Sequence, residues 1–275
     1  MSALLYIVAA FELAMIVTGL VLLWRVHSSP TARLYCISSP LDPWSAPVSH
    51  FLLFVGYVFL GTMIVAVVAQ LIGRGLPLTG DALKIFNGAA GQFGMIAGVA
   101  AYHFGVERVR SCTNPATSGV LRSGVITFLI SLPVLAAASY AWKVFLRLSG
   151  LPDEAQDLIR MFAQAESAWL VVGMTLLAVV VAPIAEELVF RAGLYRYFRT
   201  RMPRSIALVA PALFFAVLHV DWPTMDGIAS VGPLVALAIV YSIAYERTGS
   251  IATTIVAHAL FNLNTIVMIL SGVGV

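Results

Sequence analysis

Charged side chains are scarce in this sequence: Asp, Glu, Lys and Arg make up 11% of its 275 residues, whereas hydrophobic residues make up 60%. A soluble domain carries roughly 25% charged residues. The deficit, together with a mean hydropathy of +0.96, excludes an ordinary soluble domain and predicts a polytopic membrane protein. The formal net charge of +3 requires no nucleic-acid partner, because basic cytoplasmic loops account for it.

Cysteine is also scarce. Cys36 and Cys112 are the only two, so no disulfide framework is predicted. The first residues lack the basic segment and the A-x-A site of a cleaved signal peptide, and we interpret them as a first spanning helix. No tandem repeat, low-complexity tract or soluble appendix is found, which predicts one integral membrane domain over residues 1–275.

Long apolar runs are abundant. Because a helix needs about 20 apolar residues to cross the hydrocarbon, the sequence predicts an all-α bundle of about eight transmembrane helices. The predicted spans lie near 3–24, 51–73, 88–106, 120–142, 168–190, 205–220, 231–245 and 250–271. The third contains GMIAG, a small-xxx-small pattern that lets helices approach closely. The connections 27–47 and 148–167 are long enough for short interfacial helices.

The basic residues predict an orientation. Most of them lie on the odd-numbered connections, including Arg25, Arg33 and the cluster Arg196, Arg199, Arg201 and Arg204. Cytoplasmic connections carry the excess of Lys and Arg, so both termini are predicted to face outward. The cluster is most simply a topology signal, although it could also attract acidic lipid headgroups.

Several ionisable or amide side chains lie within predicted spans, where such residues are costly and usually face a cavity or a partner. Glu12 and His103 are isolated, and interfacial or structural roles are the simpler interpretation for both. The others lie in EELVFR, FFAVLH and HALFN. At a helix rise of 1.5 Å per residue, Glu186, His219 and Asn262 all fall about 20–22 Å from the cytoplasmic ends of their spans, and His258 about 16 Å.

Helical spacing predicts different roles for the two adjacent glutamates. Glu187 and Arg191 are four residues apart, the favourable order for an ion pair on a helix, whereas Glu186 points about 100° away and is left available. Phe215 and His219 are also four apart, as are His258 and Asn262. The first pair predicts an aromatic wall beside an imidazole, and the second a pair of groups facing one target.

These residue types suit hydrolysis of an amide bond. A buried carboxylate is a better base near neutral pH and, with a histidine, can deprotonate a water. A second histidine and an asparagine amide can donate to the oxyanion that forms. No Ser or Cys lies in an obvious activated context and the sequence has no G-x-S-x-G motif, so no covalent nucleophile is predicted. The H-E-x-x-H signature of zinc-protease helices is also absent.

The three motifs, in this order on successive hydrophobic helices, resemble those of the CPBP (CAAX protease and bacteriocin-processing) family of intramembrane proteases, which includes Rce1. EELVFR matches E-E-x-x-x-R, FAVLH matches F-x-x-x-H and HALFN matches H-x-x-x-N. The resemblance covers a motif-bearing core at about 168–272. It implies that Glu186 activates water with His219, that His258 and Asn262 form the oxyanion site, and that Glu187 and Arg191 support the geometry.

The sequence and the resemblance also lead to expectations about the cofactor, the substrate and alternative functions. No cofactor is expected because the side chains suffice, although Glu186, His219 and His258 could form a His₂Glu zinc set. The resemblance implies a membrane-embedded, C-terminally tailed or lipidated substrate, and the composition suits a bacterial inner-membrane enzyme. The alternatives are a non-proteolytic immunity or scaffold protein of the same family and a proton-coupled transporter, for which no internal repeat is found.

Overall fold

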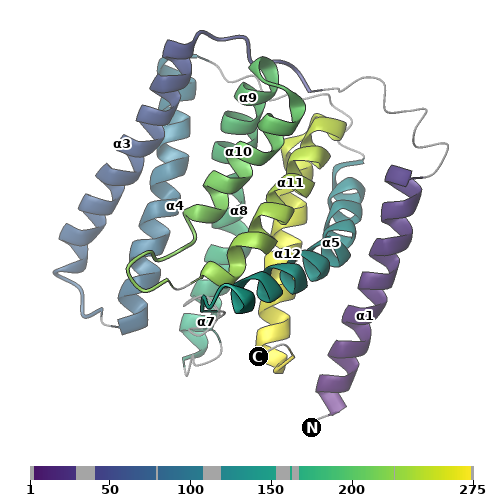
Figure 1. Cartoon of the computed structure of the whole chain (residues 1–275). Helices are drawn as coiled ribbons and strands as arrows, with labels where there is room; N and C mark the ends of the chain where they lie inside the picture. The colour runs from purple at the N-terminus through teal and green to yellow at the C-terminus, as the bar shows by residue number, and fades with distance from the viewer. Residues whose placement is uncertain are drawn as a thin grey trace.

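The computed structural model describes residues 3–28, 41–78, 80–107, 119–152, 162, 167–225 and 227–273. Helices occur at all eight predicted positions (Figure 1). The first four are α1 Ala3–Leu23 with the π-helical η1 Trp24–Ser28, α3 Val48–Gly73, α4 Gly80–Gly105 and α5 Val120–Leu148. The rest are α7 Ala168–Leu176, η3 Leu177–Val181, α8 Ala182–Glu187, η4 Leu188–Tyr195, α9 Arg196–Arg201, α10 Arg204–Val217, η5 Ile228–Ser230, α11 Val231–Thr248 and α12 Ile251–Ser271.

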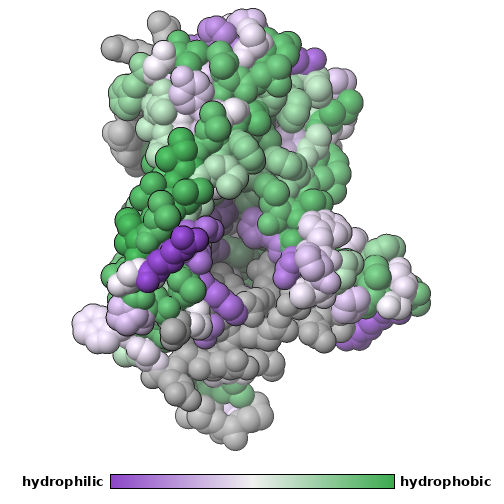
Figure 2. Space-filling view, turned by 90° about the vertical axis from the view of Figure 1, so that its left-hand side faces the viewer, coloured by the Kyte–Doolittle hydropathy of each residue, from purple (hydrophilic) through white to green (hydrophobic). Residues whose placement is uncertain are grey.

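The prediction of a helical membrane bundle is confirmed. Six helices among the described residues are long and apolar enough to cross a membrane, whereas α10 is apolar but only 14 residues long and α4 is not among the six. Figure 2 shows one side of the molecule as a largely green, apolar surface, hollowed in its lower half where hydrophilic side chains gather. An apolar outer surface is what a lipid-facing bundle requires.

The two predicted interfacial helices fall mostly outside the described residues. Residues 29–40 and most of 153–166 lie outside the described residues, as do Arg33, Cys36 and Cys112. In the first connection, residues 27–28 belong to η1 and residues 41–47 are not helical.

The fifth predicted span is the longest helical rod, running without interruption from Ala168 to Arg201. Two π-helical segments, η3 and η4, lie on either side of the short α8 that carries the two glutamates. Such segments are rare and often occur at functional sites. Gly193 lies within this continuous helix and does not break it. The ring of Phe54 on α3 packs against Gly193, where a Cβ would overlap the ring.

α3 and α4 form a closely packed pair, as the GMIAG pattern predicts. A Cβ added to Gly94 would overlap the backbone of Thr62, and one added to Gly98 would overlap the backbone of Tyr57 and Val58. Glycine therefore sets the distance between these two helices. α4 begins two turns earlier than the predicted span, at Gly80.

α5 carries Pro133 in its interior, and Figure 1 shows this helix bent along its length. Proline removes one backbone hydrogen bond and kinks a helix. α1 lies at one edge of the bundle, and the two termini lie at the same end of the molecule (Figure 1).

The arginine cluster after the fifth span has more than a topological role, because each of its side chains is bound within the protein. Arg199 and Arg204 both bind the carboxylate of Glu246, at 2.7 Å. Arg196 donates to the carbonyl of Asp42, and Arg201 donates to the carbonyls of Trp44 and Ala46. These bonds hold the segment 41–47 against α9.

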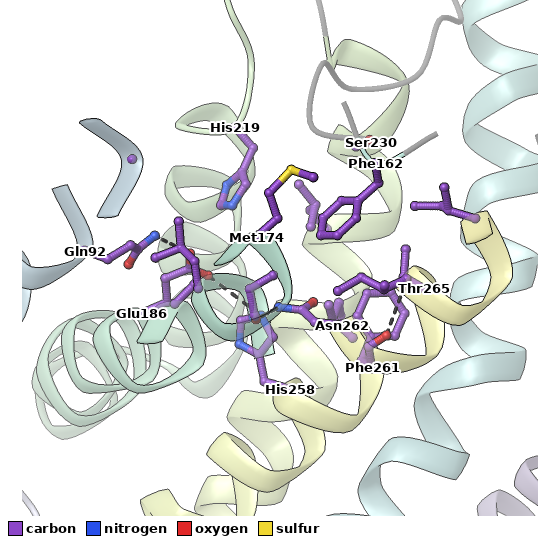
Figure 3. Close-up of a pocket in the computed structure, with 18 of the residues that line it drawn as sticks. Gln92, Phe162, Met174, Glu186, His219, Ser230, His258, Phe261, Asn262 and Thr265 are labelled. Carbon is purple, nitrogen blue, oxygen red and sulfur yellow. Dashed lines mark hydrogen bonds and ion pairs between the residues drawn. The ribbon is translucent and has the colours of Figure 1, made fainter. Parts of the chain in front are cut away.

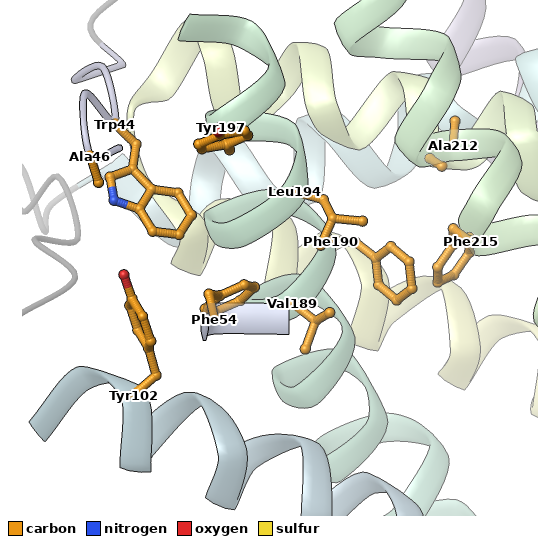
Figure 4. Packing of buried hydrophobic residues seen from close by; sticks show 11 residues of the cluster. Trp44, Ala46, Phe54, Tyr102, Val189, Phe190, Leu194, Tyr197, Ala212 and Phe215 are labelled. Carbon is orange, nitrogen blue, oxygen red and sulfur yellow. The ribbon is translucent and has the colours of Figure 1, made fainter. Parts of the chain in front are cut away.

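That segment delivers Trp44 into an aromatic core between α3, α4 and the long rod (Figure 4). The indole makes edge contacts with the rings of Phe54, Tyr102 and Tyr197, at centroid distances of 5.5, 6.1 and 5.6 Å respectively. The core fixes α4 against the rod that carries the glutamates, and so fixes one wall of the site described next.

Candidate active site

A cavity of about 430 Å³ lies inside the bundle, between α4, the rod of η3 and α8, the end of α10, and helices α11 and α12. Its polar lining includes Gln92, Glu186, His219, His258 and Asn262 (Figure 3). The structure therefore brings the four residues with predicted catalytic roles to one chamber. The remaining wall is mostly apolar, including Met174, Leu177, Leu234, Phe261, Ile266 and Ile269.

Glu186 is a buried carboxylate on α8 whose two oxygens face different partners. The amide nitrogen of Gln92, on α4, donates to Oε1 at 3.1 Å. Oε2 lies 3.8 Å from Nε2 of His258, too far for a direct hydrogen bond. Glu186 and His258 therefore face each other across a gap inside the cavity wall, with Gln92 holding the carboxylate from the other side.

Glu187 is fully buried and binds two cationic or hydrogen-bonding groups through Oε1. Nη1 of Arg191 lies at 2.9 Å, which is the predicted i,i+4 ion pair, and Nδ1 of His258 lies at 3.0 Å. The guanidinium of Arg191 also lies over the rings of Phe215 and Tyr241, at 5.1 and 5.5 Å. Rings compensate a buried cation through their quadrupole, so this pair is held by three neighbouring helices.

The bond to Glu187 fixes the protonation pattern of His258. A carboxylate only accepts, so Nδ1 of His258 carries the proton, and Nε2 is the nitrogen that faces Glu186 and the cavity. His258 can donate from Nε2 only in its imidazolium form. The carboxylate of Glu187 therefore fixes the orientation of the His258 ring, with Nε2 directed toward the cavity.

His219 differs in position from its prediction, because α10 ends at Val217 and the histidine lies in the turn beyond it. Its Nδ1 donates to the carbonyl of Phe215 at 2.8 Å. Carbonyls of the last helical turn lack intrahelical partners, so the imidazole caps the helix that it follows. This leaves Nε2 of the neutral ring with its lone pair. The predicted aromatic wall is present, with the Phe215 ring centroid 4.5 Å from that of His219.

Asn262 lies one turn after His258 on α12, on the same face, as its spacing predicts. Its amide nitrogen donates to the carbonyl of Ala178 at 2.7 Å, within the π-helical segment η3. An amide nitrogen has two protons, so one remains for a group in the cavity. Asn262 thus offers a donor on the wall where Nε2 of His258 also faces the cavity, and His258 becomes a second donor in its imidazolium form.

Two other ionisable residues of the spans lie apart from this cavity. Glu12 on α1 accepts a hydrogen bond from Asn264 on α12, at 3.1 Å, and neither residue is in the lining. His103 lies near the end of α4, with its ring against Phe104 at 4.9 Å. Their structural interpretation agrees with these contacts.

Among the described residues, no group of three His, Cys, Asp or Glu side chains is placed to hold a metal ion. Nδ1 of His219 and Nδ1 of His258 are bound to protein oxygens, so Nε2 is the nitrogen that each ring has to offer in the cavity.

Gln92 is a polar residue of this cavity that sequence reasoning missed. It lies in a Gly-rich helix, matches none of the three motifs, and is uncharged, so neither its charge nor its spacing distinguishes it from a helix-packing residue. Its place beside Glu186 depends on how α4 packs against α8, which a motif within α8 cannot report.

Comparison with known families finds a similarity in the C-terminal part of the chain. Residues 168–264 match the model of the Rce1-like family, described as type II CAAX prenyl endopeptidase Rce1-like. The match includes both glutamates, Arg191, His219, His258 and Asn262, and excludes Gln92. Searches of curated proteins and of solved structures found no match to this chain.

Proposed function

We propose that this integral membrane protein is an intramembrane endopeptidase that hydrolyses a peptide bond of a membrane-embedded or lipid-anchored substrate. The observation that carries the proposal is the cavity that Glu186 on α8, His219 in the turn after α10, and His258 and Asn262 on α12 line together. The similarity of residues 168–264 to CAAX prenyl endopeptidases supports the same reaction class.

In this mechanism Glu186 is the general base. Its carboxylate takes a proton from a water that His219 helps to hold, and the hydroxide adds to the carbonyl carbon of the substrate. The oxyanion accepts hydrogen bonds from Asn262 and from Nε2 of the His258 imidazolium. When the intermediate collapses, the C–N bond breaks and the amine leaves with the proton that Glu186 took. Glu187 and Arg191 position His258 and do not touch the reacting atoms.

The apolar wall of the cavity supports a substrate whose residues beside the cleaved bond are hydrophobic. A C-terminal tail of a membrane-embedded or lipidated protein fits this requirement, and a prenylated CAAX-type peptide is one such substrate. The side chains of the site provide the base and the donors, and the proposed reaction uses no metal.

We also propose that both termini face outward from a bacterial inner membrane. The termini lie at one end of the bundle (Figure 1), while the arginines of α9 and Arg247 of α11 lie at the end of the bundle opposite to them. The basic end of a membrane protein faces the cytoplasm. A reporter fused to the C-terminus, active only outside the cytoplasm, tests this orientation.

The central experiment compares Glu186→Gln with Glu12→Gln. Membranes or vesicles that contain each variant are incubated with a farnesylated peptide reporter, and its cleavage is measured. In a second measurement, the C-termini of the membrane proteome are compared between samples with and without active protein. A lost general base costs about 10²- to 10⁴-fold in rate, so Glu186→Gln should abolish detectable cleavage. Glu12→Gln, the same change in a helix outside the cavity, should cleave normally.

The opposite result identifies the rival function. If Glu186→Gln and Glu186→Ala leave the folded protein fully functional in cells, and no C-terminus changes, the protein is a non-proteolytic member of the same family.

A further inference from the structure

A second cavity, of about 550 Å³, lies between α1 with η1, α5 and α11. It shares no lining residue with the catalytic cavity. Its volume is in the range of roughly 300–1,000 Å³ that holds a small ligand. Nothing in the proposed reaction uses it.

The shape of this cavity follows from how α1 leaves the bundle. At Gly19 the helix touches α5 so closely that a Cβ would overlap the carbonyl of Leu129 and the ring of Pro133. The cavity begins about one turn beyond, at Leu23. At the far end, Nη1 of Arg247 on α11 donates to the carbonyl of Val26 at 3.1 Å and joins α11 to η1. Both ends are therefore defined by contacts.

The lining changes from apolar to polar along its length. Deeper positions on α5 and α11 are aliphatic: Ile126, Ile130, Val134, Ala236, Ile239, Val240 and Ile243. Most of the polar side chains lie in the last turns of η1 and α11 and the first turn of α5: His27, Ser123, Arg247 and Thr248; Thr127 lies one turn further along α5. These three helix ends lie at the same end of the bundle (Figure 1). A cavity that is largely aliphatic along its length and cationic at one end fits an amphiphilic ligand.

The charged residue of the lining favours a ligand with an anionic headgroup. Arg247 brings a guanidinium to the lining, and none of the described lining residues is acidic. The neighbouring carboxylate of Glu246 is directed to Arg199 and Arg204 instead. Basic pockets between membrane helices at the cytoplasmic side bind acidic lipid headgroups, and this end of the bundle carries the arginine cluster.

We propose that this cavity is a binding site for an anionic phospholipid, with one acyl chain between α1, α5 and α11 and the phosphate at Arg247 and His27. The lipid would fasten α1 to the bundle. α11 separates the two cavities, since Leu234 and Leu237 line the catalytic one and Ala236 and Val240 line this one.

The test measures lipid binding alone, so that it stands or fails separately from the proteolytic function. The purified full chain in detergent is titrated with phosphatidylglycerol or phosphatidylcholine, and bound lipid is counted by native mass spectrometry alongside thermal stability. Phosphatidylglycerol should bind one to one and raise the melting temperature more than phosphatidylcholine does. The Glu186→Gln variant should behave in the same way as the unaltered chain.

Three variants locate the site. Arg247→Gln should weaken phosphatidylglycerol binding about fivefold, the effect of one basic residue near a lipid surface, and Arg247→Lys should restore most of it. Lys143→Gln, the same charge change at the other end of α5 where the side chain is exposed, should change nothing. Ala236→Phe, which fills the apolar part, should abolish the one-to-one adduct.

Equal binding of the two lipids, or an unchanged preference in Arg247→Gln, would overturn the assignment of the headgroup site. Because Arg247 also bonds to α1, that variant can fail to fold; Ala236→Phe then decides. An unchanged one-to-one phosphatidylglycerol adduct in Ala236→Phe would refute the cavity as the place where the chain lies.

Discussion

The amide nitrogen of Gln92 on α4 donates a hydrogen bond to Oε1 of Glu186 on α8, across 3.1 Å. The direction is set by chemistry, because a carboxylate has no proton to give. The amide oxygen of Gln92 is buried without a hydrogen-bond partner among the described residues. The proposed general base is thus held by a residue from the first half of the chain, outside the region similar to the endopeptidases.

Replacing Gln92 should therefore slow cleavage without unfolding the protein. A hydrogen bond to a charged group contributes about 1.5–3 kcal/mol, so Gln92→Leu should lower kcat about 10- to 100-fold with little change in KM. Steady-state kinetics on the peptide reporter in vesicles measure this. Gln70→Leu on the exposed face of α3 is the matched control. A normal kcat in Gln92→Leu would remove Gln92 from the mechanism.

The buried ion pair of Glu187 and Arg191 predicts an asymmetric response to mutation. Arg191→Met leaves the Glu187 carboxylate buried and uncompensated, which costs about 3–5 kcal/mol, and should sharply lower the melting temperature in detergent. Adding Glu187→Gln should recover part of the loss, because the neutral amide oxygen still accepts from His258. Arg199→Met should cost less, since Arg204 still binds Glu246. A double variant no more stable than Arg191→Met would contradict this account.

Glycines of α4 predict where added volume is tolerated. Gly98→Ala puts a methyl group into the backbone of α3, whereas a Cβ at Gly91 meets nothing within 4 Å. Gly98→Ala should lower both the melting temperature and the cleavage rate, because α4 also carries Gln92. Gly91→Ala should leave both unchanged or slightly improved, since alanine favours a helix. Identical behaviour of the two variants would argue against the close α3–α4 contact.

Metal removal should not abolish the activity. The described residues offer no group of three ligands, so cleavage by the purified protein should survive thorough chelation, and elemental analysis should find less than one metal ion per chain. Activity that chelation abolishes and zinc restores would instead establish a metal-dependent enzyme.

How far the sequence leads can be judged from particular residues. The spacing of Glu187 and Arg191 predicts their ion pair, and GMIAG predicts the close approach of α3 and α4; both are observed. The two π-helical segments around α8 are not predictable, because LAVVV and LVFRAGLY fit an α-helix equally well. The end of α10 before His219 was also missed, since an apolar run alone does not report that the imidazole caps the last turn.

The sequence by itself determined that this chain forms apolar helices, and that a carboxylate, two imidazoles and an amide lie within them, because hydrophobicity and helical spacing are local properties. Only the tertiary structure decided which groups touch: that His258 binds Glu187 and faces Glu186, that Gln92 holds Glu186, and that α1 leaves a second cavity. The hydrogen bond between Gln92 and Glu186 joins residues 94 positions apart, and that between Arg247 and Val26 joins residues 221 positions apart. They depend on helix packing, which no single segment encodes.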